Sequence, residues 1–177
     1  MAATAGTAQR FGIRLDKQYF NFGSAHFLIF ADGTREELHG HNYKATLELD
    51  GPLDAGHVVA DFIVVKPIFK QCCDELDHRT LFPTLHPQLT LQVNDSEVVA
   101  LFATVRGEVD RYVVPLRDVR LLEIANTSSE LLACWLLDQF LVRLAARLPD
   151  FAPTRVQVSV QESPGQSAVV QRVFHAG

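Results

Sequence analysis

Three histidines have the residue type and spacing of a metal site. His39 and His41 are separated by one residue, and His26 lies thirteen positions before His39. Side chains at positions i and i+2 of a strand point to the same side, so a strand that begins here would direct both imidazoles at one point. With His26 on a neighbouring strand, three neutral imidazoles would leave a fourth position open, as in a catalytic zinc site. A solvated turn at His39-Gly40-His41 is the alternative, and the spacing leaves both interpretations open.

Two further positions carry groups that can transfer protons or hold a polar ring. Asp77 and His78 are adjacent, and a carboxylate beside an imidazole can form a proton-transferring pair. A histidine at the C-terminal end of a helix, where the helix dipole stabilises it, accounts for the same residues without a function. Glu162 precedes a Ser-Pro-Gly turn. Its carboxylate can accept two hydrogen bonds from a planar amidine-like group, although a solvated turn residue would look the same.

Alternating apolar residues predict the strands that must position these groups. The expected strands are 10–23 with a bulge near Asp16 and Lys17, then 41–50, 155–161 and 168–174. We also expect an inserted β-hairpin region at 82–124, with short strands at 88–93, 98–105, 112–114 and 119–124.

Two helices complete the expected order ββααββ. The first should span 62–76 after Asp61 as its N-cap, with Pro67 as an awkward interior residue. The second should span 131–148, because Thr127 and Glu130 form a capping box before a wide apolar face. Residues 1–9 are expected to be a loose tail of a single domain.

Composition excludes several classes of protein. The chain has 177 residues, 47% of them hydrophobic, and a net charge of −5, which is typical of one globular domain. Since no cluster of Lys and Arg and no long apolar run occurs, we expect neither a nucleic-acid partner nor a membrane span. The N-terminus lacks the features of a signal peptide. The odd set Cys72, Cys73 and Cys134 argues against a disulfide framework and for the cytoplasm. All three cysteines fall in predicted helices, so we expect them to be dispensable for chemistry.

Six short segments together resemble the 6-pyruvoyltetrahydropterin synthase / 6-carboxytetrahydropterin synthase family. They occur in the order of the family and extend over nearly the whole chain except 82–124. The segments are Phe22-Gly23-Ser24-Ala25-His26, His39-Gly40-His41-Asn42-Tyr43, Val59-Ala60-Asp61-Phe62, Leu76-Asp77-His78-Arg79, Thr127-Ser128-Ser129-Glu130 and Gln161-Glu162-Ser163.

The resemblance implies an α+β tunnelling fold (T-fold), in which two helices pack on one face of an antiparallel sheet. Such units pair their sheets around a shared barrel, as a homo-oligomer that is a trimer or a dimer of trimers, with sites between subunits. The implied enzyme is a zinc-dependent lyase whose pterin substrate is 7,8-dihydroneopterin triphosphate. The implied site has His26, His39 and His41 on the zinc, Asp77 and His78 in acid-base roles, and Glu162 on the pterin ring with Ser128 and Ser129 nearby.

The chain departs from the family pattern before His39. The usual catalytic cysteine stands four residues before the first histidine of the pair, where this chain has Arg35. Glu36 instead resembles the subgroup in which a glutamate replaces the cysteine and the side chain is cleaved to give 6-hydroxymethyl-7,8-dihydropterin. Glu37 is the rival for the general base, because spacing cannot rank adjacent loop residues.

Other outcomes stay open from the sequence. A 6-carboxy- or 6-pyruvoyl-tetrahydropterin synthase would use nearly the same site. A zinc-free relative that binds a pterin without catalysis is the alternative from a different class. No Gly-rich dinucleotide loop is present, in agreement with a reaction that needs no redox cofactor. The insertion at 82–124 directly follows Asp77 and His78, so it could reshape the pocket.

Overall fold

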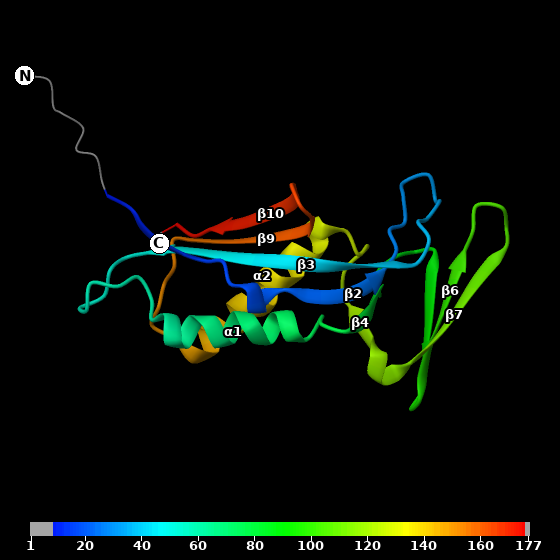
Figure 1. Ribbon diagram of the computed structural model, residues 1–177, viewed down its shortest axis with the longest axis horizontal. Helices are drawn as coiled ribbons and strands as arrows, with labels where there is room; N and C mark the ends of the chain where they lie inside the picture. Colours follow the sequence, from blue (N-terminus) through cyan, green and yellow to red (C-terminus); the bar gives the residue numbers. More distant parts are fainter. Residues whose placement is uncertain (1–8, 176–177) are drawn as a thin grey trace, which may run out of the picture.

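The computed structural model describes residues 9–175 and contains a large sheet, two helices and a smaller sheet (Figure 1). The predicted tail, 1–9, lies outside the described residues except for its last position. The strands are β1 (Phe11–Leu15), β2 (Phe22–His26), β3 (His39–Gly51), β4 (Arg79–Pro83), β5 (Leu89–Val93), β6 (Glu97–Ala103), β7 (Val109–Pro115), β8 (Val119–Leu122), β9 (Arg155–Ser163) and β10 (Gln166–Val173). The helices are α1 (Phe62–Asp74) and α2 (Ser129–Arg147). Both helices lie on the same side of the large sheet, so the predicted α+β arrangement is confirmed.

The long strand β3 organises the large sheet. The strand order is β10-β9-β3-β2-β4-β8, and β1 also pairs with β3. The first part of β3 pairs with β2 and the second part with β1, on one edge, while β9 pairs along the other edge. Alternate residues of β3, namely Ala45, Leu47 and Leu49, are fully buried in the core that also contains side chains of α1 and α2. The period-2 pattern therefore predicts the right buried face of β3.

The prediction of one continuous strand over 10–23 is wrong, because this segment forms two strands, β1 and β2. A 3₁₀ turn at Gln18–Phe20 separates β1 from β2, and the ring of Phe20 is fully buried in the core. The turn lets the chain bring β1 and β2 to different parts of β3. β2 ends at His26, which was expected on the strand that neighbours His39 and His41.

The helix caps agree with the prediction at one helix and differ at the other. The carboxylate of Asp61 accepts a hydrogen bond from the N–H of Ile63 at 2.7 Å, as expected, and α1 continues through Pro67. In α2 the N-cap is Ser128, whose hydroxyl accepts from Leu131. The predicted cap Thr127 is wrong, because its hydroxyl is fully buried and bonded elsewhere.

The separate small sheet is shorter in sequence than the predicted insertion at 82–124. β8 pairs in parallel with β4 inside the large sheet, and β4, which was not predicted, pairs in parallel with β2. Only β5, β6 and β7 form a separate antiparallel sheet. The short length of β4 and β8 and their parallel pairing leave no local alternation from which their place could be deduced.

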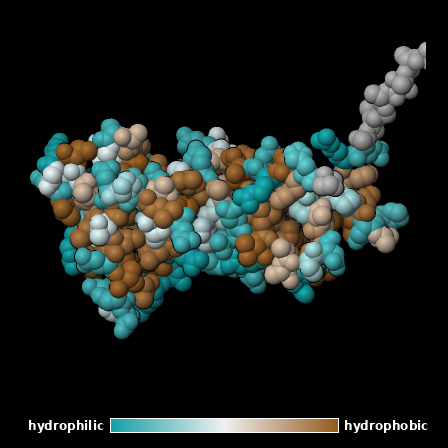
Figure 2. Space-filling view, turned by 180° about the vertical axis from the view of Figure 1, so that it is seen from behind, coloured by the Kyte–Doolittle hydropathy of each residue, from teal (hydrophilic) through white to brown (hydrophobic). Residues whose placement is uncertain are grey.

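The small sheet packs on a second core that begins directly after β2. Phe27 and Phe82 from the large sheet's end meet Ala100 and Phe102 of β6 in this cluster. On the opposite face of the small sheet, Val99 of β6 is buried, whereas Thr90 and Val113 on the two outer strands are exposed. Apolar residues gather at this end of the molecule (left in Figure 2). Among residues 9–175, no helix is both long and apolar enough to cross a membrane.

Candidate metal centre

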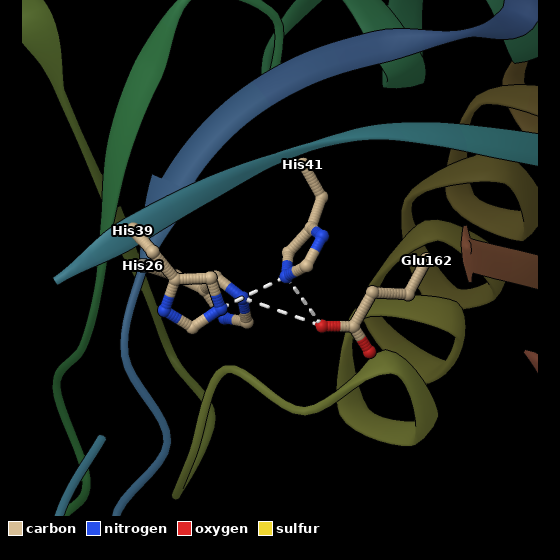
Figure 3. Close-up of side chains that lie close together, drawn as sticks. All are labelled: His26, His39, His41 and Glu162. Atoms are coloured by element: carbon tan, nitrogen blue, oxygen red, sulfur yellow. Dashed lines mark hydrogen bonds and ion pairs between the residues drawn. The ribbon is translucent and has the colours of Figure 1, made fainter. Parts of the chain in front are cut away.

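The pairing of β2 with β3 brings the three histidines together. His26 lies directly opposite His39 in the antiparallel ladder, and His41 lies two residues further along β3, opposite Ser24. Because residues i and i+2 of a strand share a face, both β3 imidazoles project to the side on which His26 stands. Figure 3 shows the rings directed at a common point.

Glu162 joins the histidines from a third strand. β9 pairs with the other edge of β3, and its end carries the Glu162 carboxylate to 2.8 Å from Nε2 of His41 and 3.7 Å from Nε2 of His26. The Nε2 atoms of His39 and His41 are 2.8 Å apart. One donor atom from each of the four residues lies within 4.8 Å of the others. The sequence reasoning assigned Glu162 to the substrate only, since nothing in the local pattern indicates the β3–β9 register.

These donor atoms fit a metal ion. The Nδ1 atoms of His26 and His39 lie 3.0 and 2.7 Å from the backbone carbonyls of Thr127 and Glu37. A carbonyl oxygen only accepts hydrogen bonds, so each Nδ1 carries the proton and each Nε2 presents a lone pair. Ligand atoms around a tetrahedral zinc stand about 3.4 Å apart. Here the His39–His41 and His41–Glu162 separations are both 2.8 Å, the His26–Glu162 separation is 3.7 Å, and all four donor atoms lie within 4.8 Å of one another.

Burial keeps His26 in the form that a metal requires. The ring is 1% exposed, and this burial is the main reason that the pKa of His26 is lowered. The lowered pKa favours the neutral imidazole, because only the neutral ring has a lone pair to donate.

Two residues beside His26 were missed by the sequence reasoning. The fully buried hydroxyl of Tyr43 lies 2.9 Å from Nε2 of His26, and its pKa is raised, chiefly by burial, so the phenol keeps its proton. The Thr127 hydroxyl donates to the carbonyl of Phe27 at 2.9 Å and lies 3.3 Å from Nδ1 of His26. Thr127 was interpreted as a helix cap only, whereas Tyr43 follows the i, i+2 series of His39 and His41 and could have been found from it.

The two candidate glutamates face different ways. The Glu36 carboxylate accepts a hydrogen bond from the N–H of Leu28 at 3.2 Å and lies 3.9 Å from Nε2 of His39. The Glu37 side chain is 98% exposed and lies 3.7 Å from Nη1 of Arg35. Only Glu36 is therefore directed at the histidines.

Asp77 and His78 lie apart from the histidines within one chain. Asp77 accepts from the N–H of Gly23 at 2.8 Å and pairs with Nδ1 of His78 at 2.9 Å. Burial alone would raise the pKa of Asp77, but these two partners bring it below its usual value. The exposed His78 ring lines a cavity of about 520 Å³ with Gly23 and Asn42, which alternate with the histidines along β2 and β3, and with His41 itself. Gly23 is three residues, or about 10 Å along the strand, from His26.

The expected substrate residues share a second cavity beside the cluster. Ser128, Ser129 and Glu162 line a cavity of about 420 Å³ together with Leu28. The hydroxyl of Ser129 donates to Oε2 of Glu162 at 3.2 Å, while Oε1 faces His41. Glu162 thus connects the cavity with the histidines.

The cysteines lie in the helices, as predicted. Cys72 and Cys73 are fully buried in the main core, and burial raises the pKa of the Cys72 thiol to about 11. Cys134 is half-buried, with its sulfur 4.0 Å from Asp138. No cysteine among residues 9–175 is part of the histidine cluster.

Comparison with known proteins gives a consistent result. The profile of a family described as 6-pyruvoyl tetrahydropterin synthase matches residues 15–173. A protein of Methanocaldococcus jannaschii, provisionally named 6-carboxy-5,6,7,8-tetrahydropterin synthase, is 33% identical over 156 residues, which cover 85% of this chain and 89% of that protein.

Solved structures agree over the same range. The crystal structure of 6-pyruvoyl tetrahydropterin synthase from Plasmodium vivax has 29% identity and a TM-score of 0.84, and the match covers 94% of this chain and 100% of that one. A variant of that enzyme, in which a glutamate described as a catalytic residue is replaced by alanine, matches with 28% identity, the same TM-score and the same coverage. The predicted T-fold is confirmed by these matches.

Proposed function

The chain belongs to the 6-pyruvoyl tetrahydropterin synthase family, and from this premise we propose that it is a zinc-dependent lyase acting on 7,8-dihydroneopterin triphosphate or a close relative. We propose that it cleaves the side chain of this substrate to give 6-hydroxymethyl-7,8-dihydropterin. The observation that carries the proposal is the Glu36 carboxylate, 3.9 Å from Nε2 of His39. A glutamate named as catalytic in the Plasmodium vivax enzyme supports a glutamate base.

In this proposal the three histidines hold the zinc and Glu36 is the general base. Zinc held by His26, His39 and His41 would supply Lewis-acid chemistry toward the side-chain hydroxyls of the substrate. Glu36 accepts the proton of such a hydroxyl, the adjacent C–C bond breaks, and the hydroxyl-bearing carbon leaves as an aldehyde. His78 of a neighbouring copy supplies a proton to the carbon that stays on the pterin. The distance of Glu36 from the cluster supports the first transfer, since a group within one hydrogen bond or one water of its target can act as a base.

Glu162 and Ser129 would bind the pterin ring. The ring presents an amidine-like edge, and the Glu162 carboxylate at the cavity wall can accept two parallel hydrogen bonds from it. Its present bond with Ser129 holds the carboxylate in the cavity. The Ser128 hydroxyl is occupied as the α2 cap, so we assign it a place in the wall rather than a hydrogen bond to the ring.

We propose that Asp77 and His78 act on the site of a neighbouring copy of the chain. The support is that Asp77 is bonded to Gly23, three residues along β2 from His26, and that the cavity lined by His78 contains only one of the three histidines, His41. Mixing tests this arrangement: inactive His39→Ala and His78→Ala variants should regain part of the activity when their subunits are exchanged. No recovery after exchange, or a monomer in sedimentation, would contradict a shared site.

The decisive experiment is product identification with a matched pair of variants. Zinc-loaded protein should convert 7,8-dihydroneopterin triphosphate to 6-hydroxymethyl-7,8-dihydropterin. Glu36→Gln should lower the rate about 10²- to 10⁴-fold, as expected for a lost general base, while Glu37→Gln leaves it unchanged. If only Glu37→Gln, or neither, lowers the rate, the assignment of the base is wrong.

The second candidate is formation of 6-carboxy-5,6,7,8-tetrahydropterin. The name of the Methanocaldococcus jannaschii relative favours it. The same incubation distinguishes the two by the product. Zinc-loaded protein that binds a pterin and gives no product would instead support a non-catalytic binding protein.

A further inference from the structure

We propose that Arg35 is a positioning residue, which uses the small sheet as a support to hold the Glu36 carboxylate beside the histidine cluster. The inference rests on one part of the proposed function, namely the assignment of Glu36 as the general base. It also assigns a role to the sheet formed by β5, β6 and β7, which contributes no residue to the cluster among the described residues.

Arg35 connects two segments that are far apart in the sequence. Its Nε and Nη2 both donate to Oδ2 of Asp110 on β7, at 2.9 and 2.6 Å. Its Nη1 donates to the backbone carbonyl of Glu36 at 2.7 Å. Because the guanidinium is planar and rigid, these bonds fix the Glu36 backbone relative to the small sheet.

Aromatic rings enclose the same guanidinium. Its central carbon lies 5.6 Å from the ring of Phe27, 5.8 Å from that of Phe102 and 5.4 Å from that of Tyr112. The Arg35 side chain is only 15% exposed, so the cation–π attraction and the ion pair act with little competition from water. Arg35 therefore points toward the aromatic rings of the second core.

The loop that carries Glu36 is attached to the small sheet at a second point. Gln88, just before β5, donates to the carbonyls of Gly33 at 3.2 Å and Ala103 at 3.0 Å. Gly33 has a φ of +81°, and a Cβ there would come within 2.7 Å of Val105. The loop thus follows the surface of the sheet closely before it reaches Arg35.

The geometry of Glu36 depends on the backbone that Arg35 holds. The N–H of Glu36 donates to the carbonyl of Leu28 at 2.9 Å, and its carboxylate accepts from the N–H of Leu28 at 3.2 Å. A shift of about 1 Å at a reacting group can cost about 10²-fold in rate. Loss of the Arg35 contact should therefore reduce turnover without changing any group that touches the substrate.

The kinetic test is a double-mutant cycle. Arg35→Ala should lower kcat about 10- to 100-fold with KM and zinc content close to wild type. In a Glu36→Gln background the same change should cause no further loss, because the effect passes through Glu36. The matched control is Arg111→Ala, because Arg111 lies next to Asp110 on β7 at an exposed position. This variant should leave kcat unchanged. An equal loss of kcat in both backgrounds would overturn the proposal.

Amide hydrogen exchange tests the positioning directly, without substrate or turnover. In the Arg35→Ala variant, the amide hydrogens of Leu28 and Glu36 should exchange faster than in wild type. In Arg111→Ala their exchange rates should be unchanged. Arg35→Lys keeps the positive charge and the aliphatic part of the side chain but lacks the planar guanidinium. It serves as the second variant if Arg35→Ala fails to fold, and it should also raise the exchange rates of these two amides.

The two measurements separate this proposal from the proposed function. If Glu36→Gln keeps wild-type turnover, the base assignment fails, and the exchange rates still decide whether Arg35 holds the loop. Unchanged protection at both amides in the folded Arg35 variants would overturn the proposal whatever the kinetics show.

Discussion

Replacing Thr127 by valine removes one hydroxyl from beside His26 and leaves the shape of the side chain nearly unchanged. The hydroxyl donates to the carbonyl of Phe27 at 2.9 Å and lies 3.3 Å from Nδ1 of His26, in a fully buried position. The change therefore acts on the residue that supports the His26 ring and touches none of the four residues of the cluster.

The expected magnitude follows from these contacts. Loss of one partner from a buried hydrogen bond costs about 1–3 kcal/mol, so the free energy of unfolding of the metal-free protein should fall by that amount. Residues that orient a ligand contribute about 10- to 100-fold in metal affinity. The His26 Nδ1 keeps its 3.0 Å contact with the carbonyl of Thr127, so we expect a loss near the lower limit, about tenfold.

Urea unfolding of metal-free protein and competition for zinc with a chelator measure the two effects. Thr46→Val is the matched control, because Thr46 is a buried threonine of β3 whose hydroxyl forms none of the side-chain hydrogen bonds found among residues 9–175. If Thr127→Val weakens zinc binding no more than Thr46→Val does, the hydroxyl does not support the ring. If zinc binding weakens while stability stays unchanged, the assigned bond to Phe27 is wrong.

Three further predictions test other parts of the site and its surroundings. His39→Ala should lose stoichiometric zinc and turnover together by elemental analysis and assay, and metal retained by this variant would refute its assignment as a ligand. A variant with Cys72, Cys73 and Cys134 replaced should keep its turnover, since burial raises the pKa of the first two thiols and the third lies on α2; a folded but inactive variant would contradict this. The pKa of Asp77 is lowered in the folded protein, so its contribution to stability should be present above about pH 4 and be lost as the pH falls through the folded-state pKa. The stability difference between wild type and Asp77→Asn should shrink in acid unfolding, and a difference that grows below pH 4 would show that the sign is wrong.

Local chemistry made part of the fold predictable. Alternation in β3 identified its buried face, and the N-cap at Asp61 identified the start of α1, because both signals depend on neighbours in the chain. The place of β8 was not predictable in this way, because β8 pairs in parallel with β4 although the three strands of the small sheet separate them in the sequence. The cap of α2 was misplaced by one residue because Thr127 and Ser128 both carry a hydroxyl that can cap a helix. The bond of the Thr127 hydroxyl to a distant carbonyl leaves Ser128 as the cap.

The sequence by itself determined that His39 and His41 would share one face if a strand began there, since that follows from the period of two. Tertiary structure decided what meets them there. The β2–β3 register places His26 opposite His39, and the β3–β9 register brings in Glu162 from 121 positions after His41. It also distinguished Glu36 from Glu37, which have the same chemistry and adjacent positions. Contacts with Leu28 on one side and Arg35 on the other turn the two carboxylates apart, and such long-range packing leaves no periodic signal in the chain.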